Sequence, residues 1–108
     1  MPYIYERRED ERYALARGMK LLDPRAQRYR PGRTLNVSAS GALVEMRGGE
    51  HLPAGQSIQL AIDWAGSAKL MNRGDLIGAT VVRHGDREGE ASLLAVRFNQ
   101  RLTLATAA

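Results

Sequence analysis

The 108-residue sequence contains no cysteine, and this absence excludes several kinds of chemistry. Disulfide bonds, thiolate nucleophiles and zinc sites with cysteine ligands all require that residue. Long apolar runs are also missing, so no segment approaches the roughly 18 residues of a transmembrane helix. The N-terminal residues MPYIYERREDERY are charged where a signal peptide needs an apolar segment. We therefore expect a cytoplasmic protein without membrane insertion.

Positive charge is concentrated in the first third of the chain. Residues 1–33 hold nine Arg or Lys against five Asp or Glu, whereas residues 34–108 hold seven of each. The whole net charge of +4 therefore lies before residue 34. If the protein has an anionic partner, we expect that partner to bind this first third.

Short segments with strand character follow one another along most of the chain. Residues 57–63 alternate cleanly between apolar and polar positions, as a half-buried strand does. Residues 13–22 fit a strand or a helix, and Gly18 favours the strand. Residues 23–32 end in Pro-Gly and are expected to be a polar loop. The expected strands are 13–22, 33–38, 41–46, 57–63, 76–83 and 90–99, with a short strand as an option at 68–71.

About six short strands at this spacing indicate an all-β domain, either a small closed barrel or a sandwich. No segment has the period of about 3.6 residues that marks an amphipathic helix. The length of 108 residues allows one domain. We divide the chain into an N-terminal arm at 1–12, a β body at 13–100 and a short C-terminal tail at 101–108.

Groups for catalysis or metal binding are sparse. His51 and His84 stand in or beside expected turns without a carboxylate at a useful spacing, so both are expected to be solvated loop residues. The segment NVSASGA lacks the pattern of a nucleophile elbow, and no phosphate loop or dinucleotide fingerprint is present. We expect no enzymatic activity, no metal site and no cofactor.

Two polar groupings remain. Arg8 and Arg12 lie four residues apart on the charged arm, with Arg7 beside them. Each guanidinium can bind a phosphate bidentately, bind the O6/N7 edge of guanine or stack on a base. The second grouping, N-V-S-A-S-G at residues 36–41, falls at the turn between two expected strands. Taken alone, the second grouping is more typical of a local turn than of a binding site.

The two groupings, in this order, resemble the R-x-x-x-R and (D/N)-x-S-x-x-G motifs of the PilZ domain, a bacterial receptor domain for cyclic di-GMP. The likeness also includes LPAGQSIQLAI, and LIGATVVRH followed by SLLAVRF, so that it extends over roughly residues 6–99. The resemblance implies a six-stranded antiparallel split barrel with a flexible N-terminal arm. It also implies that cyclic di-GMP is bound as a ligand and is not a cofactor.

The resemblance further implies a role for each motif residue. The residues concerned are Arg7, Arg8, Arg12, Asn36, Ser38 and Gly41. The arginines of the R-x-x-x-R motif would hold phosphate and guanine, with Arg7 as an additional cation. Asn36 and Ser38 would meet the guanine edge and neighbouring polar atoms, and Gly41 would keep that face flat.

Two features depart from the family pattern. Position 36 is Asn where Asp is common, and an amide offers one acceptor oxygen where a carboxylate offers two. We expect this difference to affect the affinity for the ligand and not the ability to bind it. The C-terminal helix of many family members is short or missing here. The resemblance therefore does not extend to dimerisation through such a helix.

Several functions are compatible with these features. The first is a cyclic di-GMP receptor that passes second-messenger state to a protein partner by ordering its arm. The alternative is a degenerate PilZ-like adaptor that binds a protein partner without nucleotide. A nucleic-acid-binding barrel would need aromatic side chains on a strand face, whereas five of the six aromatics precede residue 65. Homo-oligomers are compatible with either of the first two functions.

Overall fold

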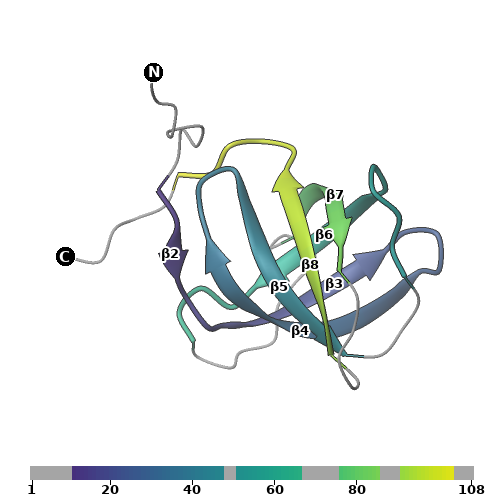
Figure 1. The fold of residues 1–108 in the computed structure, drawn as a ribbon, viewed down its shortest axis with the longest axis horizontal. Coiled ribbons are helices and arrows are strands. Elements are labelled where there is room, and N and C mark those ends of the chain that lie inside the picture. Colours follow the sequence, from purple (N-terminus) through teal and green to yellow (C-terminus); the bar gives the residue numbers. More distant parts are fainter. Residues whose placement is uncertain (1–10, 48–50, 67–75, 86–90, 104–108) are drawn as a thin grey trace.

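The computed structural model describes residues 11–47, 51–66, 76–85 and 91–103, and all regular elements in these ranges are β-strands (Figure 1). The expected all-β class is therefore confirmed. No helix that could cross a membrane occurs in the described ranges. The strands are β2 (Tyr13–Ala14), β3 (Gly18–Asp23), β4 (Arg28–Val37), β5 (Gly41–Arg47), β6 (Ser57–Ile62), β7 (Ile77–His84) and β8 (Ala91–Phe98).

Six of these strands close into an antiparallel barrel. In the sheet, β4 is followed by β3, β6, β7, β8 and β5, and β5 pairs again with β4. Closure gives each of these six strands a neighbour on both sides, so none of them is an edge strand along its whole length. The short strand β2 is additional and pairs with the last residues of β4 (Figure 1). The six-stranded barrel implied by the family resemblance is confirmed.

The core is built from side chains that alternate along the strands. In β5, for example, Ala42, Val44 and Met46 are buried, and the residues between them are half-buried. This period of two residues places one face of each strand inside the barrel. The fully buried large side chains include Leu21, Val37, Val44, Met46, Leu52, Ile58, Leu60, Val81 and Leu94. Each contributes roughly 1.5–3 kcal/mol of hydrophobic stabilisation.

The structure corrects two strand predictions near the N-terminus. Residues 13–22 do not form one strand, because 15–17 separate β2 from β3. Residues 23–32 are not a loop, because the turn is confined to 24–27 and β4 already begins at Arg28. Pro31 is tolerated in β4 because residues 28–31 pair with β3 alone, while the pairing with β5 starts at Gly32. Proline is found at such edge positions, where its missing N–H is not needed.

His84 is not a solvated loop residue, so that prediction was wrong. It is the last residue of β7 and is buried. The Leu52 N–H donates to His84 Nδ1 at 2.8 Å, and Nε2 lies 2.8 Å from Ser92 Oγ. Because Nδ1 accepts, the ring proton is on Nε2 and is donated to Ser92. His51 is an exposed loop residue as expected, and its ring stacks on that of His84 at 4.7 Å.

Three predictions concern residues outside the described ranges. These are the flexible arm over residues 1–10, the optional strand at 68–71 and the end of the turn predicted at 84–89.

Candidate ligand-binding site

The pairing of β2 with β4 brings the two sequence motifs together. Tyr13 lies opposite Val37 and Ala14 lies opposite Asn36. Arg12 directly precedes β2, and its Nη1 donates a hydrogen bond to Asn36 Oδ1 at 3.3 Å. This contact is exposed to solvent and joins residues that are 24 positions apart. The C-terminal arginine of R-x-x-x-R and the first residue of N-x-S-x-x-G are therefore neighbours.

A β-bulge in β4 sets the direction of the Asn36 side chain. Thr34 lies opposite Val44 and Asn36 lies opposite Leu43, so Leu35 is an extra residue in the ladder. Thr34 is buried, and strict alternation would direct Asn36 inward as well. The extra residue shifts the alternation, so that Asn36 is half-buried while Val37 enters the core. Bulges commonly redirect a side chain in this way next to functional sites.

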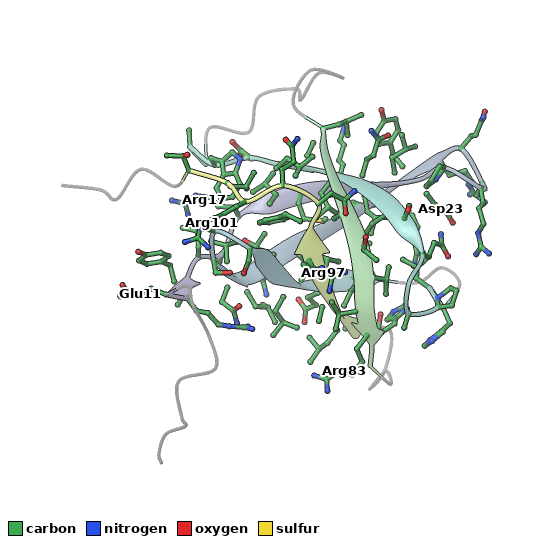
Figure 2. All side chains as sticks on the ribbon, turned by 90° about the horizontal axis from the view of Figure 1, so that it is seen from above. Glu11, Arg17, Asp23, Arg83, Arg97 and Arg101 are labelled. Atoms are coloured by element: carbon green, nitrogen blue, oxygen red, sulfur yellow. The ribbon has the colours of Figure 1, made fainter. Side chains whose placement is uncertain are left out.

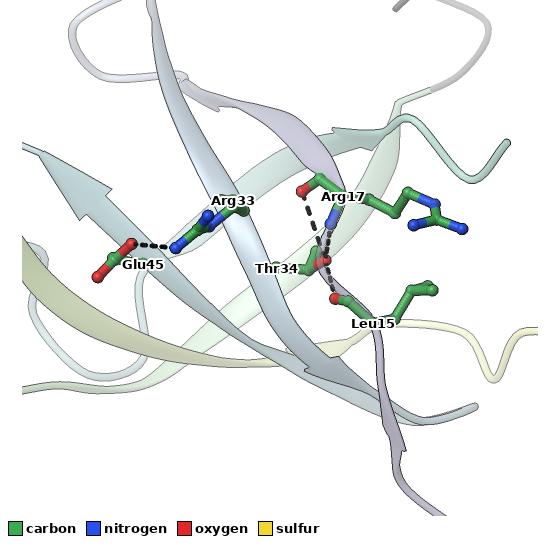
Figure 3. A network of polar contacts seen from close by, with 5 residues as sticks. All are labelled: Leu15, Arg17, Arg33, Thr34 and Glu45. Atoms are coloured by element: carbon green, nitrogen blue, oxygen red, sulfur yellow. Dashed lines mark hydrogen bonds and ion pairs between the residues drawn. The ribbon is translucent and has the colours of Figure 1, made fainter. Parts of the chain in front are cut away.

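Thr34 attaches the segment between β2 and β3 to β4 (Figure 3). Its hydroxyl accepts a hydrogen bond from the Arg17 N–H at 2.9 Å and donates to the Leu15 carbonyl. The Thr34 backbone N–H also donates to the Arg17 carbonyl at 2.8 Å. Leu15 N–H in turn donates to the Leu35 carbonyl at 3.2 Å. These bonds fix the chain directly after β2 and thereby position Arg12.

Ser38 closes the turn between β4 and β5. Its side chain is buried, and its Oγ accepts from the N–H groups of Ser40 at 3.3 Å and Gly41 at 3.2 Å. The Ser38 backbone N–H donates to the Gly41 carbonyl at 2.8 Å. A serine hydroxyl that accepts from backbone N–H groups two and three residues later stabilises a turn. The local turn that this motif taken alone indicates is therefore present in the structure.

Gly41 is required by close packing and not by an unusual backbone angle. The glycines with positive φ in the described ranges are Gly55 and Gly66, and Gly41 is not among them. A Cβ at Gly41 would lie 2.3 Å from the Val96 carbonyl oxygen. Real Cβ atoms do not approach backbone oxygens so closely. Glycine is therefore the residue that allows β5 and β8 to meet at this point.

Cationic side chains gather at the end of the barrel that carries β2. Figure 2 shows Arg17, Arg101 and Glu11 at this end of the long axis and Asp23 at the opposite end. Arg17 donates to the carbonyls of Trp64 and Ala16, both at 3.2 Å, and no described carboxylate pairs with it. Arg17 is half-buried, and a guanidinium whose described partners are carbonyls keeps its charge available to an anionic ligand.

The structure thus places four of the six predicted site residues. Arg12 and Asn36 are in contact, and Ser38 and Gly41 share the adjoining turn. Arg7 and Arg8 lie outside the described residues. Sequence reasoning missed Thr34, whose hydroxyl positions the chain after Arg12. No local pattern marks it, because its partners lie 17 and 19 residues earlier.

The family model for the PilZ domain matches residues 6–108 of this chain. The chain therefore belongs to the PilZ domain family, whose members are binding and receptor domains for cyclic di-GMP and not enzymes. This family membership confirms the resemblance drawn from the two motifs. No curated protein matches the sequence.

Several solved structures share the fold, including two bacterial proteins. The inhibitor of motility MotI/DgrA of Bacillus subtilis superposes with a TM-score of 0.68 at 19% identity, covering 89% of this chain and 44% of that chain. The PilZ domain of YcgR from Escherichia coli, solved with cyclic di-GMP, gives a TM-score of 0.63 at 15% identity, covering 87% of this chain and 79% of that one. This chain therefore corresponds to less than half of MotI, and the likeness at these identities establishes the fold.

Proposed function

We propose that this domain is a receptor for cyclic di-GMP without catalytic activity of its own. The observation that carries the proposal is the hydrogen bond from Arg12 to Asn36, because it joins the two motifs at one end of the barrel. Membership of the PilZ family and the fold shared with the YcgR domain support the same function. The location that this function requires is the cytoplasm.

The ligand has two parts that this end of the barrel can complement. Cyclic di-GMP carries two phosphates and two guanines, and arginine side chains bind phosphates and guanine edges through planar pairs of N–H groups. In this proposal Arg12 and Arg8 supply these forks, with Arg7 as a further cation. Asn36 contacts a guanine edge, while Ser38 and Gly41 form the turn on which that base rests.

Ordering of residues 1–12 would transmit ligand binding to a protein partner. The arm carries Arg7, Arg8 and Arg12 together with several carboxylates, and it has no apolar pattern that would pack it against a core. Fixing a residue costs roughly 1–2 kcal/mol of conformational entropy, so only strong ligand contacts would offset the ordering of such a segment. Amide exchange at residues 6–12 is therefore expected to slow when ligand is added, and unchanged exchange at saturation would contradict this mechanism.

Calorimetric titration of the domain with cyclic di-GMP tests the proposed function. Linear pGpG and GTP serve as controls, because they contain the same base but lack the ring closed by two phosphodiester linkages. We expect saturable binding of cyclic di-GMP and much weaker binding of both controls. Equal binding of all three ligands, or no binding of cyclic di-GMP, would refute the proposal.

A protein-binding adaptor without nucleotide is the second candidate, and one observation favours it. Val82 and Leu93 are 50% and 43% exposed on neighbouring strands β7 and β8. Contiguous apolar surface is typical of sites that contact other proteins, and in this reading the two side chains contribute to such a surface. An adaptor would retain its partner after loss of Arg8 and Arg12, whereas a cyclic di-GMP receptor would lose its regulation.

A further inference from the structure

The outer face of the barrel carries a row of three residues that extends the candidate site across β8. Gly41 on β5 and Thr80 on β7 both lie opposite Arg97 on β8. Side chains directly opposite each other in a sheet are about 4.5–5.5 Å apart at Cβ. Arg97 is exposed, and its pairing with Gly41 places it beside the glycine of the N-x-S-x-x-G motif. Figure 2 labels Arg97 on β8.

Arg97 has no partner among the described residues. No described carboxylate forms an ion pair with it. Glu45, a carboxylate on the neighbouring strand β5, is held by Arg33 at 3.2 Å. The five N–H groups of the Arg97 guanidinium are thus available to a ligand.

Asn99 adds a second donor to the same face. Its backbone N–H donates to the Gly78 carbonyl at 2.9 Å, and its Oδ1 accepts from the Thr80 hydroxyl at 2.9 Å. Its Nδ2 lies 3.0 Å from the position that a Cβ of Gly78 would occupy, so the amide rests over that glycine. No described residue accepts from Nδ2. The acceptor of this amide is occupied, and its two N–H groups are free to donate.

We propose that Arg97 and Asn99 form a guanine-selective subsite, an inference that rests on the proposed binding of cyclic di-GMP. Both residues present donors only, and the Hoogsteen edge of guanine presents only the acceptors N7 and O6. Adenine presents an acceptor and a donor on the same edge, so this surface rejects adenine. Gly41 and Gly78 flank the subsite without side chains and leave a flat surface for the base. Arg97 binds O6 and N7 of the guanine bidentately. Asn99, which is held by Thr80 of β7, donates a further hydrogen bond to the same edge of the base.

Calorimetry on variants of the intact domain tests this subsite. Arg97→Ala is expected to weaken cyclic di-GMP binding by about tenfold or more, and Arg97→Lys does not restore it because lysine lacks the fork. Asn99→Asp keeps the size of the side chain but replaces two donors by an acceptor, and it is expected to weaken binding as well. Both variants should reduce the preference for cyclic di-GMP over cyclic di-AMP. The matched control is Arg47→Ala, an exposed arginine opposite Ala91 at the other end of the β5–β8 pair.

The outcomes separate this inference from the proposed function. Wild-type affinity in Arg97→Ala, together with a clear loss in Arg12→Ala, would overturn the subsite and leave the receptor function intact. Equal losses in Arg97→Ala and Arg47→Ala would also overturn it, because the effect would then be one of net charge. Absence of cyclic di-GMP binding by the wild-type domain would refute the proposed function and the subsite together. Unfolding curves of the variants should match the wild type, since Arg97 and Asn99 are both exposed.

Discussion

Arg12 Nη1 donates a hydrogen bond to Asn36 Oδ1 at 3.3 Å, and this oxygen is the only acceptor atom of the Asn36 side chain. The other polar groups of these two side chains are N–H groups, which can only donate. A guanine that offers N1–H and N2–H must therefore share this one oxygen with Arg12, whose hydrogen bond uses one of its two lone pairs. A carboxylate at this position would serve Arg12 and the base with separate oxygens.

Asn36→Asp is accordingly expected to tighten cyclic di-GMP binding. A charged acceptor forms a stronger hydrogen bond than a neutral one, and a gain of roughly two- to tenfold corresponds to about 0.4–1.4 kcal/mol. Cyclic di-AMP should gain little, because adenine has no N1–H. Asn36→Ala is the matched loss variant and should bind more weakly with an unchanged fold. A clear loss of cyclic di-GMP affinity in Asn36→Asp at unchanged stability would place Asn36 near phosphate and refute its contact with the guanine donors.

Arg8→Ala and Arg12→Ala are each expected to weaken cyclic di-GMP binding by about ten- to a hundredfold, or roughly 1.5–3 kcal/mol. Lysine at either position should not restore binding, because a single ammonium cannot pair bidentately. Arg28→Ala is the control, since Arg28 is an exposed arginine opposite Asp23, at the far end of the barrel. Calorimetry would contradict the bidentate role if both lysine variants bound as tightly as the wild type.

Gly41→Ala is expected to destabilise the fold even in the absence of ligand. The added Cβ would meet the Val96 carbonyl oxygen at 2.3 Å, and relief requires movement of β5 against β8. Overpacking of this kind costs about 1–3 kcal/mol. Gly18→Ala is the matched control, because nothing lies within 4 Å of its Cβ position. Urea unfolding should show a lower midpoint for Gly41→Ala and a wild-type or higher midpoint for Gly18→Ala, and equal midpoints would refute the packing role.

Thr34→Val is expected to weaken ligand binding through Arg12. The change preserves shape but removes the hydroxyl that accepts from Arg17 N–H and donates to the Leu15 carbonyl. Loss of these bonds should lower the free energy of unfolding by about 1–3 kcal/mol and loosen the chain next to Arg12. Thr80→Val serves as a stability control because its hydroxyl bonds to Asn99 at an exposed position. The effect of Thr34→Val on affinity should vanish in an Arg12→Ala background, and full additivity would show that Thr34 does not act through Arg12.

The strands of the barrel were predictable from the sequence where one face of the strand is buried and the other is not. Residues 57–63 alternate in hydropathy, residues 90–99 place Leu94, Val96 and Phe98 on one face, and β6 and β8 occupy nearly the same residues. The start of β4 was not predictable, because Pro31-Gly32 has the composition of a turn. Only the barrel topology shows that Pro31 lies where β4 has a single neighbour.

The candidate site was predictable as a pair of motifs but not as a geometry. The motifs could be recognised from residue types and spacing alone. The bulge at Leu35 could not, because the register between β4 and β5 depends on pairing and not on local sequence. The same holds for Arg97, which becomes a neighbour of Gly41 through the pairing of β5 with β8.

An amide-resolved NMR titration with cyclic di-GMP tests the central claim most directly, because it reports binding and its location together. The account predicts saturable shifts at Arg12, at residues 36–41 and at residues 97–99. It also predicts unchanged signals at the turn of residues 24–27, at the opposite end of the barrel. Shifts confined to other parts of the barrel, or no shifts at saturating ligand, would contradict a cyclic di-GMP site where β2 meets β4.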